Sequence, residues 1–159
     1  MTEQNTSWCQ SVGGVVLHDG RVLLARHTYG AGKGRLIIPG GYVRQGESAE
    51  DALCREFYEE TGVRVAARGI LGVRFNAKDW YVVFAADYIS GDARSDQDEN
   101  DLAVWMPVRE ALESADVPDL SKRLIARAAQ GAYLLMPAQY DSIQANPGHL
   151  YAAQMEESL

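Results

Sequence analysis

The sequence predicts an α/β domain, because stretches typical of β-strands are interleaved with two stretches typical of amphipathic helices. Residues 11–26 contain two short apolar runs joined by an Asp-Gly turn, a pattern typical of a β-hairpin. Residues 80–89 are rich in aromatic and β-branched side chains and predict a long strand. The two main helices are expected at residues 48–61 and 119–130, where apolar side chains recur with the helical period.

The first part of the chain is expected to be mainly strand and loop. The hairpin consists of residues 11–17 and 21–26 on either side of its turn. A glycine-rich loop follows at residues 27–35 and carries two cationic side chains. The short apolar strand at residues 36–38 ends at a Pro-Gly-Gly sequence, since proline removes a backbone donor and the glycines favour a turn.

The helix at residues 48–61 has a start signal, a core-facing stripe and a stop signal. Ser48 is a good N-cap, and Asp51 three residues later resembles a capping box. Leu53 and Phe57 are four residues apart, so both face the core. Gly62 is placed to end the helix in a left-handed conformation, because glycine adopts a positive φ without steric cost.

The elements after this helix are less regular in sequence. Residues 63–75 hold β-branched stretches interrupted by glycines, and residues 90–101 form a polar, acidic loop. The remaining expected elements are a strand at 102–106 ended by Pro107, a short helix at 108–114, and the 119–130 helix ended by Gly131.

A length of 159 residues predicts one domain with a sizeable core. We divide the chain into a flexible N-terminal arm at residues 1–10, a folded domain at 11–131 and a C-terminal extension at 132–159. The extension carries several tyrosines among small polar residues, and its sequence leaves three options open: packing on the domain, packing on a second subunit, or fraying.

Charge and composition exclude several classes of function. The net charge of -7 makes duplex DNA a poor partner, while a small phosphorylated ligand is compatible if a cation supplies local positive charge. No apolar run reaches the roughly 18 residues needed to span a membrane. The N-terminus lacks the features of a secretory signal, so we expect a cytoplasmic protein. Cys9 and Cys54 have neither CxxC nor zinc-site spacing.

Three acidic residues are concentrated on one face of the 48–61 helix. Glu56, Glu59 and Glu60 stand at i, i+3 and i+4, which places their Cβ atoms within about 6 Å of one another. Carboxylates at this spacing repel, and a hard divalent cation such as Mg2+ relieves the repulsion because it prefers oxygen ligands. The alternative for the three glutamates alone is a solvated acidic helix face.

The segment at residues 41–63, GYVRQGESAEDALCREFYEETGV, resembles the Nudix box, G-x5-E-x7-R-E-U-x-E-E-x-G-U, in which U is a bulky apolar residue. All fixed residues of the box are present at its spacing, and a chance match is on the order of one in 10⁸ per starting position. Phe57 occupies a position where an aliphatic residue is usual, which we interpret as a packing variation. The matching residues are Gly41, Glu47, Arg55, Glu56, Phe57, Glu59, Glu60, Gly62 and Val63.

The resemblance implies a Nudix hydrolase with the family's α/β/α sandwich and a mixed central sheet, over about residues 12–130. It implies that Glu59 and Glu60 are the principal metal ligands and that Glu56 is a further ligand or the base that activates water. The backbone carbonyl of Gly41 would be another ligand. Arg55 resembles the family's orienting arginine, paired to a glutamate of the box. Mg2+ is the expected cofactor, and Mn2+ the expected substitute.

Family members often add one more acidic residue from a loop before a late strand that contains tryptophan. Trp105 lies in such a strand here, and Glu99 lies six residues before it. Glu99 is therefore a candidate ligand or base, with Asp96 and Asp98 as nearby rivals. The alternative for Glu99 is a solvated loop acid.

The predicted substrate contacts rest on analogy with the family and on charge. Arg26, at the end of the second strand, and the loop cations Lys33 and Arg35 are candidates for binding the phosphates, with ordinary solvated charge as the alternative. Glu47 would complete the acidic cluster from the loop before the helix. Tyr81 is a candidate for contacting the base, although a strand tyrosine is equally compatible with the core.

The resemblance narrows the reaction to hydrolysis of a pyrophosphate bond but leaves the substrate open. A (deoxy)nucleoside triphosphate such as an oxidised dGTP is the first expectation, and ADP-ribose or a nucleotide sugar is the alternative. The proline that often marks ADP-ribose enzymes about fifteen residues beyond the box is absent at residues 77–79. A non-catalytic nucleotide-metabolite sensor is a further alternative, although the box is intact. Family members are often homodimers, which makes a homodimer an expectation by analogy alone.

Overall fold

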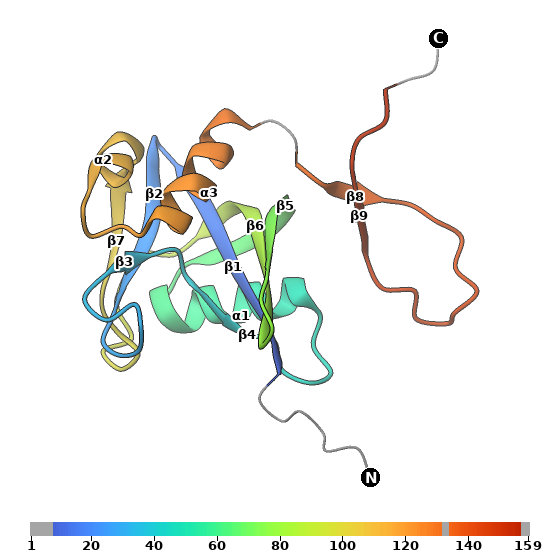
Figure 1. Ribbon diagram of the computed structural model, residues 1–159, viewed down its shortest axis with the longest axis horizontal. Coiled ribbons are helices and arrows are strands. Elements are labelled where there is room, and N and C mark those ends of the chain that lie inside the picture. The colour runs from blue at the N-terminus through green and yellow to red at the C-terminus, as the bar shows by residue number, and fades with distance from the viewer. Residues whose placement is uncertain (1–7, 132–133, 157–159) are drawn as a thin grey trace.

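The computed structural model describes residues 8–131 and 134–156, so residues 1–7 of the expected N-terminal arm and residues 132–133 and 157–159 of the extension lie outside it (Figure 1). Its centre is a mixed seven-stranded sheet. The elements are β1 (Cys9–His18), β2 (Arg21–His27), β3 (Leu36–Ile37), β4 (Gly40–Tyr42), α1 (Ala49–Thr61), β5 (Arg64–Phe75), β6 (Asp79–Ser90), β7 (Asn100–Pro107), α2 (Val108–Glu113), α3 (Asp119–Gln130), β8 (Met136–Ala138) and β9 (Leu150–Ala152).

The strand β1 organises the sheet because it pairs with three neighbours. It runs parallel to β6 along most of its length and antiparallel to both β2 and β4. The β4 pairing covers Ser11 to Gly13, and the β2 pairing covers Leu17 and His18, so the two partners occupy different ends of the same strand. Beyond these, β3 and β7 flank β2, and β5 lies at the far edge beside β6.

Helices cover both faces of the sheet, as the α/β/α expectation requires (Figure 1). Alternate residues of β1 point to opposite faces: Val12 and Val16 belong to the core under α1, while Val15 belongs to the core under α2 and α3. On β6, Phe84 likewise belongs to the core under α1, and Ala85 belongs to the core under α2 and α3. Two apolar clusters therefore hold the helical layers against one sheet.

The helix α1 begins and ends as predicted. The Ser48 hydroxyl accepts a hydrogen bond from the Asp51 N–H at 3.1 Å, and Gly62 has φ 72° in the left-handed region. The aromatic ring at the box's aliphatic position has a local explanation: a Cβ on Gly14 would lie 2.9 Å from both Leu53 and Phe57. The missing side chain of Gly14 provides the space that Phe57 fills.

Several predicted boundaries differ from the structure by one or two residues, and Gly40 and Gly41, which we expected in a turn, lie in the strand β4 because it pairs with β1. The first strand begins at Cys9, two residues earlier than expected, because β1 pairs with β6 from that residue onward. The segment that we expected to be interrupted by glycines is one continuous strand, β5. Its register with β6 shifts between Ala67 and Gly69 and between Ile70 and Gly72, so glycines there accompany bulges and not breaks.

The described part of the C-terminal extension contacts the domain near its two short strands, while residues 139–150 are exposed. Leu135 and Ile70 exchange two backbone hydrogen bonds of 2.8 and 3.1 Å, which attaches the extension to the edge strand β5. The strands β8 and β9 then form a hairpin beside the sandwich (Figure 1). The Tyr151 ring packs edge-on against Phe84, with ring centres 5.7 Å apart. In the described residues, no helix is both long and apolar enough for a membrane span.

Candidate functional site

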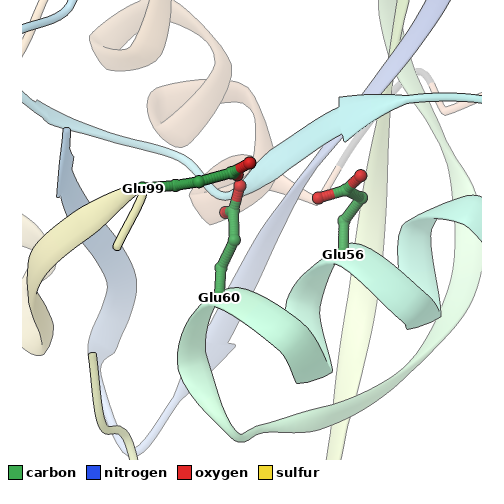
Figure 2. Close-up of side chains that lie close together, drawn as sticks. All are labelled: Glu56, Glu60 and Glu99. Carbon is green, nitrogen blue, oxygen red and sulfur yellow. The ribbon is translucent and has the colours of Figure 1, made fainter. Parts of the chain in front are cut away.

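Three carboxylates meet beside the last two turns of α1. Glu56 and Glu60 project from the helix one turn apart, and Glu99 reaches them from the residue just before β7 (Figure 2). One carboxylate oxygen from each lies within 4.8 Å of the other two. Hard oxygen ligands gathered at this spacing fit a divalent cation such as Mg2+ or Mn2+.

The electrostatics of this cluster are unfavourable without a cation. Glu60 is only 3% exposed. Burial, and then the charge of Glu56, raise the pKa of Glu60 to about 8, although a hydrogen bond from the Gly40 N–H opposes this rise. Burial also raises the pKa of Glu56 against the opposing effect of Arg55. The donor set therefore fits a bound cation, which would allow these carboxylates to remain ionised.

Arg55 forms hydrogen bonds to the acidic residues around it. Its guanidinium donates to Glu47 at 2.7 and 3.1 Å, to Glu56 at 2.9 Å and to Glu59 at 3.3 Å. It also donates to the backbone carbonyl of Tyr42 at 3.0 Å, which attaches α1 to β4. This is the position expected for an orienting arginine.

Glu47 and Glu59 lie on the Arg55 side of the helix, outside the three-carboxylate cluster. The Glu47 carboxylate accepts from Arg55 and from the Arg44 N–H, and these bonds lower its pKa to about 2. Glu47 is therefore placed as a partner of Arg55, and its contact with substrate stays a prediction. The Glu59 side chain is 50% exposed and paired with Arg55, so it can reach solvent beside the cluster.

The backbone of β4 lies directly against the cluster. A Cβ on Gly41 would lie 2.5 Å from the carboxyl carbon of Glu56, so a residue with a side chain would displace that carboxylate. The neighbouring Gly40 donates its N–H to Glu60 at 3.3 Å. Gly41 lets the strand pass close to Glu56, and Gly40 lets it pack closely on β1, which brings β4 near enough for a Gly41 carbonyl ligand.

The acidic loop brings only one of its three candidates to the cluster. Glu99 joins Glu56 and Glu60, as expected for a further ligand or base. Asp96 instead accepts hydrogen bonds from the backbone N–H groups of Asp98 and Asn100, at 2.9 and 3.1 Å, and so shapes the loop.

The three cations expected to bind phosphate lie elsewhere. Arg26 is paired with Asp101 at 2.7 Å. Arg35 donates to two backbone carbonyls in the connection between α2 and α3, at 3.1 and 3.3 Å, and so anchors the glycine-rich loop. Lys33 is exposed in that loop. Their predicted contact with substrate stays a prediction.

A cavity of about 320 Å³ adjoins the cluster through Gly40 and Gly41. Its other lining residues come from β1, β2, β3, β4, the β5–β6 hairpin and the start of α3; they are Ser11, His27, Ile37, Ile38, Tyr42, Arg74, Asp79, Tyr81, Pro118, Leu120 and Ser121. Tyr81 lines the cavity and also packs against the core, so its contact with the base stays a prediction.

The cavity also has a polar corner that the sequence analysis missed. Arg74 donates to both oxygens of Asp79 at 2.8 Å, and the Ser11 hydroxyl donates to Asp79 at 2.9 Å. The only sequence signal was a pair of opposite charges flanking the short turn between β5 and β6. Because this pair is mutually neutralised, the cavity suits an uncharged organic group better than a phosphate.

Comparisons with known proteins agree with this geometry. The model of the NUDIX domain family matches residues 9–128. An ADP-ribose pyrophosphatase of Methanocaldococcus jannaschii is 33% identical over 95 residues, which are 55% of this chain and 56% of the relative. An NAD-capped RNA hydrolase NudC of Vibrio parahaemolyticus is 31% identical over 117 residues, or 69% of this chain and 43% of the relative. The chain thus spans about half the length of these two curated relatives.

Solved structures show the same fold. A MutT NUDIX hydrolase from Burkholderia pseudomallei has a TM-score of 0.66 at 24% identity, covering 75% of this chain and 96% of that chain. A NUDIX hydrolase from Nitrosomonas europaea has a TM-score of 0.69 at 20% identity, covering 80% and 76%. At these identities the likeness concerns the fold alone.

Proposed function

The chain belongs to the NUDIX domain family, and on that premise we propose that it hydrolyses the pyrophosphate bond of a small nucleoside-diphosphate-linked substrate with the help of a divalent cation. One observation carries the proposal. Glu56, Glu60 and Glu99 converge within 4.8 Å of one another, beside a cavity large enough for part of a nucleotide. A solvated acidic helix face, the alternative interpretation, does not account for a third carboxylate that comes from a loop distant in the sequence.

The cation would be Mg2+, with Mn2+ as a substitute, held by Glu56, Glu60 and Glu99, with Glu59 and the Gly41 carbonyl as further ligands. When bound, it supplies the positive charge that neutralises the phosphoryl oxygens. Arg55 holds the carboxylate of Glu56 in place through its 2.9 Å hydrogen bond. The orientation of that carboxylate is thereby fixed before substrate arrives.

Glu99 is the residue that we propose as the base. Glu60 is buried and bonded to the Gly40 N–H, so it is poorly placed to exchange a proton with an incoming water. Glu99 is exposed and extends from a loop to the same cluster. Its carboxylate would take a proton from the attacking water, and the resulting hydroxide would attack one phosphorus as the bridging oxygen leaves with the other phosphate.

The substrate that we place first is ADP-ribose or a related nucleotide sugar. The names of both curated relatives, an ADP-ribose pyrophosphatase and an NAD-capped RNA hydrolase, denote substrates in which a diphosphate joins two organic groups. The second candidate is a (deoxy)nucleoside triphosphate such as an oxidised dGTP, which the absence of proline at residues 77–79 favours. In either case the organic group would occupy the cavity beside Gly41 and Tyr81.

The test is a hydrolysis screen with product identification. It covers ADP-ribose, nucleotide sugars, dinucleoside polyphosphates, dNTPs and 8-oxo-dGTP, with and without EDTA. We expect one class to be hydrolysed in a Mg2+-dependent manner, and we expect Glu60→Gln to abolish most of this activity. Glu110→Gln, which changes an exposed acid on α2, serves as the matched control. Binding of a nucleotide metabolite without turnover would instead support the sensor alternative.

A further inference from the structure

A buried asparagine connects the loop that carries Glu99 to the helix that carries the other two acids. Asn100, the first residue of β7, is 1% exposed. Its side-chain amide donates to the backbone carbonyl of Glu60 at 3.0 Å. The residue before it in the chain is Glu99, so this side-chain hydrogen bond links the residue next to Glu99 to the backbone of Glu60.

The backbone around Asn100 is also shaped by the loop itself. Ser95 donates its hydroxyl to the Asn100 carbonyl at 2.9 Å, and Asp96 accepts the Asn100 N–H at 3.1 Å. Gln97, at the tip between them, has φ 60° in the left-handed region. A compact turn therefore ends at Asn100, and these bonds fix the backbone next to Glu99.

The opposite side of Glu99 is held by the end of β2. The Thr28 N–H donates to the Glu99 carbonyl at 3.1 Å, and the Thr28 hydroxyl lies 2.9 Å from the Asp98 carbonyl and 3.2 Å from that of Glu99. Thr28 fixes the Glu99 backbone to β2, while Asn100 fixes the next residue to α1. These contacts hold the backbone on both sides of Glu99, whose carboxylate lies beside those of Glu56 and Glu60 (Figure 2).

The burial of Asn100 indicates that its amide serves more than packing. Its Oδ1 atom is buried and has no hydrogen-bond partner among residues 8–131 and 134–156. An apolar side chain of similar size would fill the same space without leaving a polar atom unsatisfied. The amide N–H is the group that an apolar replacement would lose, and that group binds Glu60.

We propose that Asn100 is a positioning residue that sets the Glu99 carboxylate against the α1 acids by hydrogen bonding to the Glu60 carbonyl. The inference rests on the proposed function in assuming that these three acids share a cation. It assigns to Asn100 no contact with substrate. Loss of its hydrogen bond would leave α1 intact but would release Glu99 from its place in the cluster.

The experiment is a double-mutant cycle between Asn100 and Glu99. The variants are Asn100→Leu, Glu99→Gln and the pair, and Asn100→Ser is a smaller change in case the leucine variant does not fold. Mn2+ binding to substrate-free protein is measured by electron paramagnetic resonance, and kcat and KM are measured separately. Asn146→Leu, in the exposed loop between β8 and β9, is the matched control.

We expect Asn100→Leu to weaken Mn2+ binding and lower kcat by roughly tenfold, the size typical for residues that orient ligands, with little change in KM. In the Glu99→Gln background the same change should have almost no further effect. An equal loss in both backgrounds, or no loss in either, overturns the inference.

Failure of the proposed function would look different. A wild-type protein that hydrolyses nothing would refute that function, while the Mn2+ cycle would still decide the role of Asn100. If Glu99→Gln alone leaves Mn2+ binding and kcat unchanged, Glu99 needs no positioning and the inference is wrong.

Discussion

Arg55 and Glu47 are joined by two hydrogen bonds of 2.7 and 3.1 Å, and each side chain is only 18% exposed. The pair connects the loop before α1 to the middle of the helix. Because Arg55 also donates a hydrogen bond to Glu56, the ion pair with Glu47 helps to hold the Glu56 carboxylate in its place in the cluster.

This pair makes a prediction about acid stability. The Glu47 pKa is lowered to about 2, mainly by its hydrogen bonds from Arg55, whereas in the unfolded chain it is about 4.3. Its contribution is therefore fully present above the unfolded pKa and is lost as the pH falls toward 2. We expect Glu47→Gln to lower the melting temperature at pH 7, with the difference from wild type shrinking below about pH 4. A constant difference down to pH 2 would show that the ion pair does not contribute in this way.

Glu60 makes the opposite prediction for the metal-free protein. Burial raises its pKa to about 8, so the folded state retains a proton that the unfolded state releases near pH 4.3. Stability should fall as the pH rises between these two values. Glu60→Gln should therefore stabilise the EDTA-treated protein at pH 9 by on the order of 1–3 kcal/mol, and much less at pH 5.

Thermal unfolding in EDTA at several pH values measures this effect. Addition of Mg2+ supplies an internal check, since a cation that binds only the folded state should raise the melting temperature of wild type more than that of Glu60→Gln. Equal Mg2+ stabilisation of both proteins would contradict the role of Glu60 as a ligand.

Glu99→Gln should lower kcat more than it raises KM. The loss expected for removal of a general base is roughly 10²- to 10⁴-fold, whereas the cavity that holds the organic group is unchanged. Asp98→Asn, at an exposed position in the same loop, is the matched control. Steady-state kinetics with the substrate identified in the screen separates the two parameters, and an unaltered kcat would make Glu99 a bystander.

The polar corner of the cavity predicts a different kinetic signature. Asp79→Asn removes the negative charge that Arg74 and Ser11 now bind, so it should alter binding of the organic group. We expect KM to rise several-fold, with kcat changed by less. A KM equal to that of wild type, in a protein of normal stability, would place the organic group outside this cavity.

Gly14 and Phe57 form a coupled packing pair. A Cβ on Gly14 would lie 2.9 Å from the Phe57 ring, so Gly14→Ala should destabilise the protein by roughly 1–3 kcal/mol. Leucine at position 57 is shorter, so Gly14→Ala should cost less in a Phe57→Leu background. Chemical denaturation of the four proteins measures the coupling, and additive losses would indicate that the two residues act independently.

Local patterns predicted the parts of the site that lie on one helix. Glu56 and Glu60 come together because they are four residues apart, and Ser48 and Gly62 mark the ends of the helix that carries them. The place of Glu99 followed from the resemblance to a family and not from spacing. Its approach depends on a loop whose shape is set by Thr28 and Asn100. Thr28 is far from this loop in the sequence, and no local sequence pattern marks Asn100.

The place of Ser11 in the polar corner could not be predicted because it is distant in the sequence from Asp79. Ser11 and Asp79 meet across the parallel pairing of β1 with β6, 68 residues apart. Similarly, the loop cation Arg35 appeared available for phosphate because its backbone partners lie about 80 residues further along the chain. Long-range pairing decides such contacts, and a single sequence does not display it.

The two hydrogen bonds between Ile70 and Leu135 have a consequence for the nascent chain, because Leu135 is synthesised long after Ile70. The strand β5 and its partner β6 are complete once residue 90 has left the ribosome, but Ile70 at the edge of β5 gains its partner only when Leu135 emerges. During that interval the nascent chain presents unpaired backbone groups, the kind of edge that recruits other strands. A fragment ending at residue 131 would leave Ile70 without this partner, and so would expose more of the edge to self-association.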